Sequence, residues 1–99
     1  MNYLDDLLSN KTIFFNYMKE KYEVHYKSNI FLRDLLYAIR NYYEKKNQKL
    51  DYRQSEKLAF EFTDSLVKSG ELQSMGKNTW KVNFSLETSV NEIVTENTN

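Results

Sequence analysis

Hydrophobic residues in the C-terminal half of the chain change their spacing at Gly70. From Asp51 onward, small or apolar residues recur every three or four positions, which places them on one face of an α-helix. These positions are Tyr52, Ser55, Ala59, Phe62 and Leu66, with Leu58 and Val67 beside them. Asp51 suits the N-cap, Lys68 suits the last turn, and Gly70 suits the left-handed residue that ends many helices. The pattern predicts one long helix, with Tyr52 and Ser55 in its buried stripe.

After Gly70 the apolar spacing becomes two, over the segment "ELQSMGKNTWKVNF". Its apolar positions near the end are Trp80, Val82 and Phe84, and the polar residues between them are Lys81 and Asn83. Such alternation gives a strand with one apolar and one polar face. We expect a turn at residues 76–78, because Gly and Asn tolerate positive φ. The segment therefore predicts a β-hairpin, with Trp80 packed on the preceding helix.

The N-terminal half predicts two helices separated by a short strand. Residues 3–22 have helical spacing, with a break expected at Ser9 and Asn10 and a second piece starting at Thr12. Alternation over Val24–Tyr26 favours a strand. Ser28 or Asn29 can then cap a helix of about 18 residues that ends near residue 46, and residues 47–51 form a polar turn. The expected order is helix, strand, helix, helix, strand, strand.

Length and composition are those of one α+β, mainly α-helical domain. The chain has 99 residues, no proline and two glycines, which fits a helix-rich domain with one modest core. We expect a domain over residues 1–84, followed by an acidic polar tail, residues 85–99, that is flexible or docks. The tyrosines of the first two helices, together with the tail residues Val90, Ile93 and Val94, exceed what one small core needs. They favour a homodimer, the commonest closed assembly.

Several classes of function are excluded by the residue types that are absent. There is no cysteine and one histidine, His25, so neither a metal site nor a catalytic constellation is expected. No apolar stretch is long enough for a membrane span, and the acidic N-terminus is unlike a secretion signal, so we expect a cytoplasmic protein without cofactors.

Charge is distributed unevenly although the formal net charge is zero. Residues 1–26 carry a net −1, residues 27–81 a net +4, and residues 82–99 a net −3. The basic excess therefore coincides with the two helices and the hairpin. Affinity for DNA rises with the number of phosphates that are neutralised, so this distribution matters more than the total charge.

The predicted element order, with a hairpin directly after a long helix, resembles the winged helix-turn-helix family over about residues 3–84. The resemblance implies a DNA-binding domain whose third helix enters the major groove and whose hairpin is the wing. One difference is the second helix, which is long for this family. It indicates an elaborated variant or a dimer interface, and it would allow the wing and the lysines near residue 46 to hold DNA in place of the third helix.

The resemblance assigns base-reading positions to the start of the third helix. Arg53 and Gln54 are the expected readers, because Arg can bond guanine and Gln can bond adenine through two hydrogen bonds. Lys57, one turn further on, suits a phosphate. The alternative is that these three residues form an ordinary solvated helix face.

Phosphate contacts are expected from the hairpin and from the turn before the third helix. The hairpin candidates are Ser74, Lys77, Asn78 and Lys81, and the turn candidates are Lys45, Lys46 and Lys49. Charged residues at a hairpin tip also keep its edges from pairing with other chains, which is the competing explanation. Arg33, Tyr37 and Arg40 share a basic-aromatic face of the second helix that could meet a phosphate backbone, although such a face is more often solvated or supports a dimer contact.

The expected function is sequence-specific binding of double-stranded DNA by a homodimer. The role would be that of a transcription factor, or of an accessory protein for plasmid or phage replication or conjugative transfer, where another protein of a nucleoprotein complex is a further partner. The alternative is a protein–protein docking module or inhibitor built on the same fold. No enzyme activity and no membrane association are expected.

Overall fold

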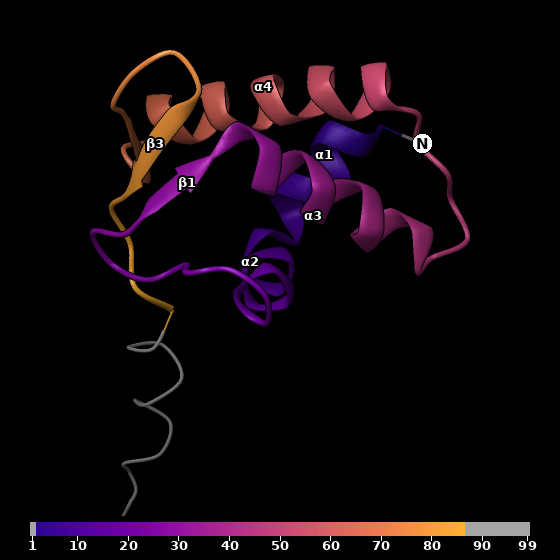
Figure 1. Cartoon of the computed structure of the whole chain (residues 1–99), viewed down its shortest axis with the longest axis horizontal. Coiled ribbons are helices and arrows are strands. Elements are labelled where there is room, and N and C mark those ends of the chain that lie inside the picture. Colours follow the sequence, from indigo (N-terminus) through magenta and orange to yellow (C-terminus); the bar gives the residue numbers. More distant parts are fainter. Residues whose placement is uncertain (1, 87–99) are drawn as a thin grey trace, which may run out of the picture.

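A computed structural model describes residues 2–86, and Figure 1 shows their arrangement. Over this range the protein is α+β and mainly helical, with four helices and one three-stranded antiparallel sheet. The helices are α1 (Tyr3–Ser9), α2 (Lys11–Lys19), α3 (Leu32–Glu44) and α4 (Tyr52–Lys68), and the strands are β1 (Asn29–Phe31), β2 (Leu72–Ser74) and β3 (Thr79–Val82). None of these helices is both long and apolar enough to cross a membrane.

The expected helix over residues 3–22 is two helices, α1 and α2, and the second ends at Lys19. The predicted break is confirmed at Asn10. Its side-chain amide donates a hydrogen bond to the backbone oxygen of Asp6 at 2.9 Å, in competition with the helical backbone ladder. The second piece begins at Lys11, one residue before the expected start at Thr12.

The strand expected at Val24–Tyr26 is wrong, because β1 lies five residues later. Val24 is buried, but the residues after it form a turn in which the Ser28 hydroxyl accepts from the His25 backbone N–H at 3.0 Å. Lys27 adopts a positive φ of 72°, which is incompatible with a continuous strand. The strand β1 therefore begins only at Asn29, although Lys27 and Ser28 already exchange backbone hydrogen bonds with Val82 of β3.

Helix α3 has 13 residues, so the expected length of about 18 is also wrong. Ser28 and Asn29 are not its cap, since β1 takes up the residues before Leu32. The N-cap position is Phe31, without a side-chain hydrogen bond, and the first helical N–H, that of Leu32, donates to the Asn78 oxygen at 2.9 Å. The hairpin tip thus takes over part of the capping of α3.

Helix α4 begins and ends as the sequence predicts. Asp51 forms a capping box with Gln54: the Gln54 N–H donates to Asp51 Oδ1 at 2.7 Å, and the Asp51 N–H donates to Gln54 Oε1 at 3.1 Å. At the other end Gly70 has a φ of 86°, and the Glu71 N–H donates to the Leu66 oxygen at 2.9 Å. This is a Schellman ending, which turns the chain directly into β2.

The sheet has the strand order β1-β3-β2, with β3 in the middle. Trp80 pairs with Ile30 on one side and with Ser74 on the other. The predicted turn at residues 76–78 forms, but neither Gly76 nor Asn78 has the positive φ that we expected. Phe84 is not part of the strand, which ends at Val82.

The core lies between the helices and the inner face of the sheet, with Phe62 of α4 near its centre. The Phe62 ring is fully buried and lies 5.7 Å from that of Phe14 and 5.6 Å from that of Phe15, measured between centroids. The predicted burial of the helix and hairpin residues is confirmed for Leu35, Ile39, Ser55, Phe62, Leu66 and Trp80. Tyr52 was expected in the core but is 56% exposed, although Leu50 and Ser55 on either side of it are buried.

The packed part of the chain reaches at least to Leu86, which is buried. Phe84 is partly buried, and its ring lies 5.0 Å from that of Phe15. Apart from Ser85 and Leu86, the expected tail lies outside the described residues, and with it Val90, Ile93 and Val94.

Candidate nucleic-acid interface

The exposed face of α4 has a net positive charge only in its N-terminal half. Arg53 and Lys57 are exposed one helical turn apart, and neither forms an ion pair with a residue in the range 2–86. Further along the same face the exposed residues are the acids Glu61 and Asp64, followed by Lys68 in the last turn. An anionic ligand would therefore meet the first two turns of α4.

Gln54 is exposed, but the capping box already uses its side chain. Its Oε1 accepts the backbone N–H of Asp51, and its own N–H binds the Asp51 carboxylate. Reading adenine requires Oε1 and Nε2 of the same amide to point at one base edge. Gln54 would have to leave the capping box to do so, which makes Arg53 the stronger base-reading candidate.

The hairpin tip carries three of the predicted residues on its surface. Ser74, Lys77 and Asn78 are exposed, and the Ser74 hydroxyl donates to the Gly76 oxygen at 3.3 Å. The Asn78 carbonyl binds the start of α3, as described above, so the tip is fastened to the helical body. Lys81 lies in the central strand, half-exposed, between its pairing partners Asn29 and Gln73.

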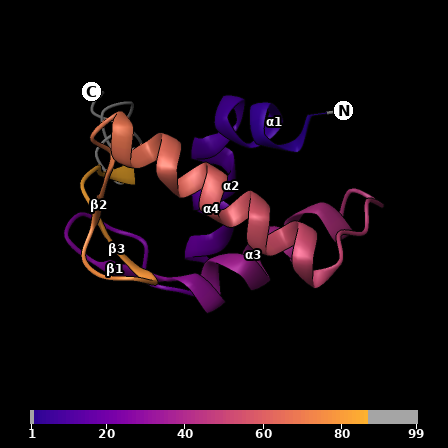
Figure 2. The same cartoon turned by 90° about the horizontal axis from the view of Figure 1, so that it is seen from above.

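The hairpin lies beside α4, at the C-terminal part of the helix (Figure 2). Trp80 is buried, and its ring makes an edge contact with Phe60 at 6.2 Å between centroids. Arg53 comes seven residues before Phe60, which is about 10 Å along the helix axis. The basic start of α4 and the hairpin thus belong to one rigid unit, and they are offset by about two helical turns along the axis of α4.

Lys49 and Gln54 line a surface hollow together with Arg40, which the sequence indicated only as a weaker candidate for phosphate contact. The hollow has a volume of about 470 Å³ and is lined by Arg40, Glu44, Lys49, Leu50, Asp51 and Gln54. It lies where α3 ends and α4 begins, so Arg40 and Lys49 flank the basic start of α4. The signal in the sequence was the spacing of Arg33, Tyr37 and Arg40, all of which are exposed on α3 as expected.

Lys45 and Lys46 contact the aromatic side of the molecule instead. The Lys45 ammonium nitrogen lies 5.2 Å from the centre of the Tyr17 ring of α2. That of Lys46 lies 4.4 Å from the Tyr42 ring and donates to the Tyr42 hydroxyl at 3.2 Å. These cation–π contacts give both lysines a structural role.

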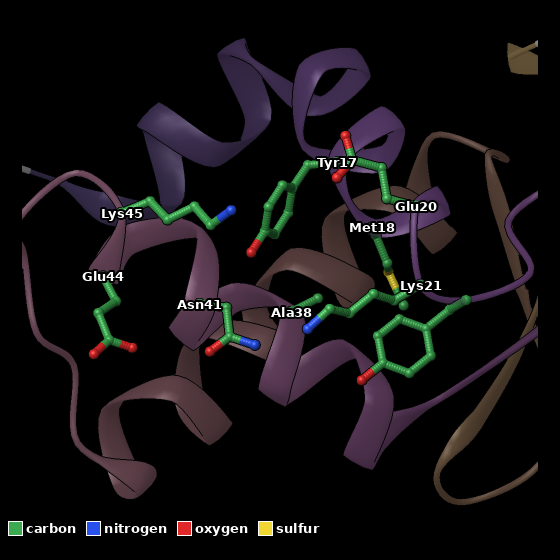
Figure 3. A pocket seen from close by; sticks show the side chains of 9 residues that line it. Tyr17, Met18, Glu20, Lys21, Ala38, Asn41, Glu44 and Lys45 are labelled. Carbon is green, nitrogen blue, oxygen red and sulfur yellow. The ribbon is translucent and has the colours of Figure 1, made fainter.

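Figure 3 shows the groove between α2 and α3 that contains Lys45. Its volume is about 370 Å³, and Tyr17, Met18 and Lys21 line it from α2 and the residues after it. Burial raises the pKa of Tyr17, and the nearby carboxylates of Glu20 and Glu44 raise it further. With two lysines and two glutamates the lining has no net charge, as has that of the hollow between α3 and α4, where Glu44 and Asp51 balance Arg40 and Lys49.

No group of three or more His, Cys, Asp or Glu side chains able to hold a metal ion is present among residues 2–86.

The buried phenol of Tyr43 has a structural role: its hydroxyl donates to Asp6 Oδ2 at 2.7 Å and joins α3 to α1. Burial, followed by that hydrogen bond, raises the pKa of Tyr43 well above its ordinary value.

The chain matches no protein-family model, no curated protein and no solved structure at a level that would show a relationship. Function therefore has to be inferred from the chemistry of its own surface.

Proposed function

We propose that this protein binds double-stranded DNA sequence-specifically as a small winged-helix domain, with α4 as recognition helix and the β2–β3 hairpin as wing. The observation that carries the proposal is the pairing of two exposed cations at the start of α4 with a lysine-bearing hairpin fixed against the same helix. A helix that presents its N-terminal half to the major groove, with a hairpin on the adjacent backbone, is an established mode of DNA binding.

The observed length of α3 supports this assignment. With 13 residues it is closer to the short second helix of winged-helix proteins than the 18 residues expected from the sequence. A separate mode, in which the wing and the lysines after α3 hold DNA without α4, is less well supported, because Lys45 and Lys46 are engaged by tyrosine rings.

Each basic residue then has a distinct role. Arg53 reads a base edge, and Lys57 binds a phosphate one turn further along α4. Arg40 and Lys49 bind the backbone beside the start of α4. Lys77 and Asn78 at the tip, with Lys81 behind them, bind the backbone under the wing.

The biological role we propose is that of a cytoplasmic transcription factor or an accessory factor for plasmid or phage replication or conjugative transfer, acting as a homodimer. A two-fold dimer would place two copies of α4 on successive major grooves and would double the length of the site. Sedimentation at several concentrations would show the dimer as a concentration-dependent mass.

Selection from a pool of random duplexes at low salt tests the proposal directly. Selected duplexes should share a short motif, and affinity for them should fall steeply with salt, by about 0.9 in log K per unit of log salt for each phosphate contacted. If the wild-type protein bound no duplex at low salt, the proposal would be wrong. The protein-docking function would then be favoured, since exposed Tyr37 and Tyr52 offer a surface to a protein partner.

A further inference from the structure

The sheet has an outer face whose composition the binding of duplex DNA does not explain. Inward-facing residues, Leu72, Trp80, Val82 and Ile30, are buried, and the residues that alternate with them face outward. Among these are two large apolar side chains, Phe31 at 50% and Met75 at 49% exposure. Contiguous exposed apolar area marks a binding surface in many proteins, whereas single scattered apolar residues need no ligand to explain them.

Strand pairing places the outward residues in two rows. In one row Lys81 lies between Asn29 and Gln73. In the other, Thr79 pairs with Phe31, and its backbone oxygen accepts from the N–H of Met75 at 2.9 Å. Phe31 and Met75 therefore lie on either side of β3, about 10 Å apart if each strand spacing is taken as close to 4.8 Å.

The segments that form this face carry only positive charges. These segments, residues 26–31 and 72–83, contain three lysines and no Asp or Glu. Acidic residues lie at both edges of the face: Glu23 and Asp34 share a hollow of about 280 Å³ with Phe31, and Glu71, which is paired with Lys11, directly precedes β2. The face thus combines exposed apolar side chains, amide and hydroxyl groups, and cations, with acids at its edges.

We infer that this outer face binds a single-stranded nucleic acid, with one base on Phe31 and a second against Met75. Bases of a single strand are free to stack on a protein side chain, whereas those of a duplex are stacked on one another. Lys81 and Lys77 bind phosphates, and Asn29, Gln73 and Thr79 hydrogen-bond base edges without strict sequence preference. A methionine sulfur against an aromatic ring is also a favourable contact.

The inference goes beyond the proposed function and does not rest on it. Duplex binding depends on Arg53 and Lys57 of α4, whereas the single strand depends on Phe31 and Met75. The two ligands share only lysines of the hairpin. Because Lys77 and Lys81 serve both ligands, duplex and single strand should compete for the hairpin.

The test uses the full chain and a twelve-residue oligo(dT), with fluorescence anisotropy as the readout. Phe31→Ala should weaken binding by about 5-fold or more, the effect of losing one base–aromatic stack. Ile13→Ala is the matched control, because Ile13 is an exposed apolar residue on α2. It should leave the affinity unchanged, and thermal melts of both variants establish that they fold.

A second variant gives a direct signal of stacking. Phe31→Trp should retain affinity, and its emission, taken as the difference from the wild-type protein, should be quenched by oligo(dT). A dodecamer of the same backbone without bases should bind weakly and quench little. Ile13→Trp should not be quenched by either.

Three outcomes would overturn the inference. These are equal affinities of wild type and Phe31→Ala for oligo(dT), equal binding of the oligomer with and without bases, and equal quenching of Phe31→Trp by a twelve-residue poly-glutamate peptide, which would indicate an acidic protein partner. Phe31→Ala should leave duplex affinity unchanged. A protein that bound duplex but not oligo(dT) would therefore contradict this inference alone. A protein that bound oligo(dT) but no duplex would contradict only the proposed function.

Discussion

Lysines on the two sides of the α3–α4 connection differ in what their charges can do. Lys45 and Lys46 follow α3 directly and lie over tyrosine rings of α2 and α3. Lys49 lies in an open hollow beside Arg40, and Lys57 is exposed on α4. The first pair covers aromatic surface and stabilises the fold, whereas the second pair remains available to a ligand. Proximity in sequence therefore did not predict a shared role.

The same contrast separates the two halves of the molecule. Where α2 packs on α3 and on the inner face of α4, aromatic rings are in contact: Phe14 of α2 makes edge contacts with Tyr42 of α3 and with Phe62 of α4. On the side of α4 and the hairpin, Arg53 and Lys77 are exposed to solvent. One half consequently determines stability and the other offers the binding surface, a division that variants can test.

The largest effect is expected on the stable side. Phe62→Ala removes a fully buried ring and should lower the free energy of unfolding by about 3–5 kcal/mol. Tyr52→Ala, on the same helix but exposed, should change it by less than about 0.5 kcal/mol. Urea unfolding followed by tryptophan fluorescence measures both. A similar loss in the two variants would show that the core extends further along α4 than the exposure of Tyr52 indicates.

On the binding side, Arg53 and Gln54 should separate although they are neighbours. Arg53→Ala should lose about 1–3 kcal/mol of discrimination at one base pair and leave stability nearly unchanged. Gln54→Ala removes half of a capping box, so it should cost about 0.5–1 kcal/mol of stability and leave base preference intact. Titrations with the selected duplex and its single-base variants, alongside urea unfolding, distinguish them. Loss of discrimination in Gln54→Ala would show that its side chain leaves the cap on binding.

The sequence predicted α4 and its ends well because every signal for that helix is local. Asp51 and Gly70 act on backbone groups within a few residues, so their effects follow from the sequence alone. The apolar stripe correctly predicted Phe62 and Leu66 as core. It failed at Tyr52, because periodicity identifies a face of the helix and does not show which positions of that face the neighbouring elements cover.

Features that depend on distant pairing were not predictable in the same way. The position of β1 is determined by its partner β3, fifty residues later, and by the turn at Lys27. The alternation of apolar and polar residues at Val24–Tyr26 favoured a strand locally, but no strand pairs with these residues in the described part of the chain. Likewise, the sequence predicted Lys45 and Lys46 as phosphate ligands, because it does not show that these exposed side chains lie over the rings of Tyr17 and Tyr42. Arg40 gained importance only when the fold brought it next to Lys49.

A smaller effect on DNA affinity should distinguish Lys77 of the hairpin from Lys46, whose ammonium group lies over a tyrosine ring. Lys77→Ala should weaken binding to all duplexes alike and make the salt slope shallower by about one unit, as expected for one lost phosphate contact. Lys46→Ala should leave that slope unchanged and instead cost about 0.5–1 kcal/mol of stability, through the lost cation–π contact. Duplex titrations at two or more salt concentrations, with a urea melt for each variant, provide the comparison. A shallower slope in Lys46→Ala would place its ammonium on DNA and not on Tyr42.

The smallest expected effect concerns the joint between the two halves, where α2 is tied to the base of the hairpin. Lys11 Nζ lies 2.8 Å from Glu71 Oε1, which also accepts from the Ser69 hydroxyl at 2.8 Å. Burial alone would raise the pKa of Glu71, but the hydrogen bonds from Lys11 and Ser69 and the charge of Lys11 outweigh it and lower the pKa below its ordinary value.

A lowered folded-state pKa means that the ion pair contributes fully above the ordinary pKa of glutamate and that this contribution is lost as the pH falls through the folded value. Because both side chains are about one-third exposed, solvent screening limits the contribution to about 0.2–1 kcal/mol. Glu71→Gln should therefore be less stable than wild type by that amount at pH 7, and the difference should shrink as the pH falls through the folded pKa of Glu71, in urea unfolding. Glu61→Gln, at an exposed position on α4, is the control for the substitution itself. A difference between Glu71→Gln and wild type that did not shrink as the pH fell would mean that the charge of the Glu71 carboxylate is not what stabilises the contact between the hairpin and α2.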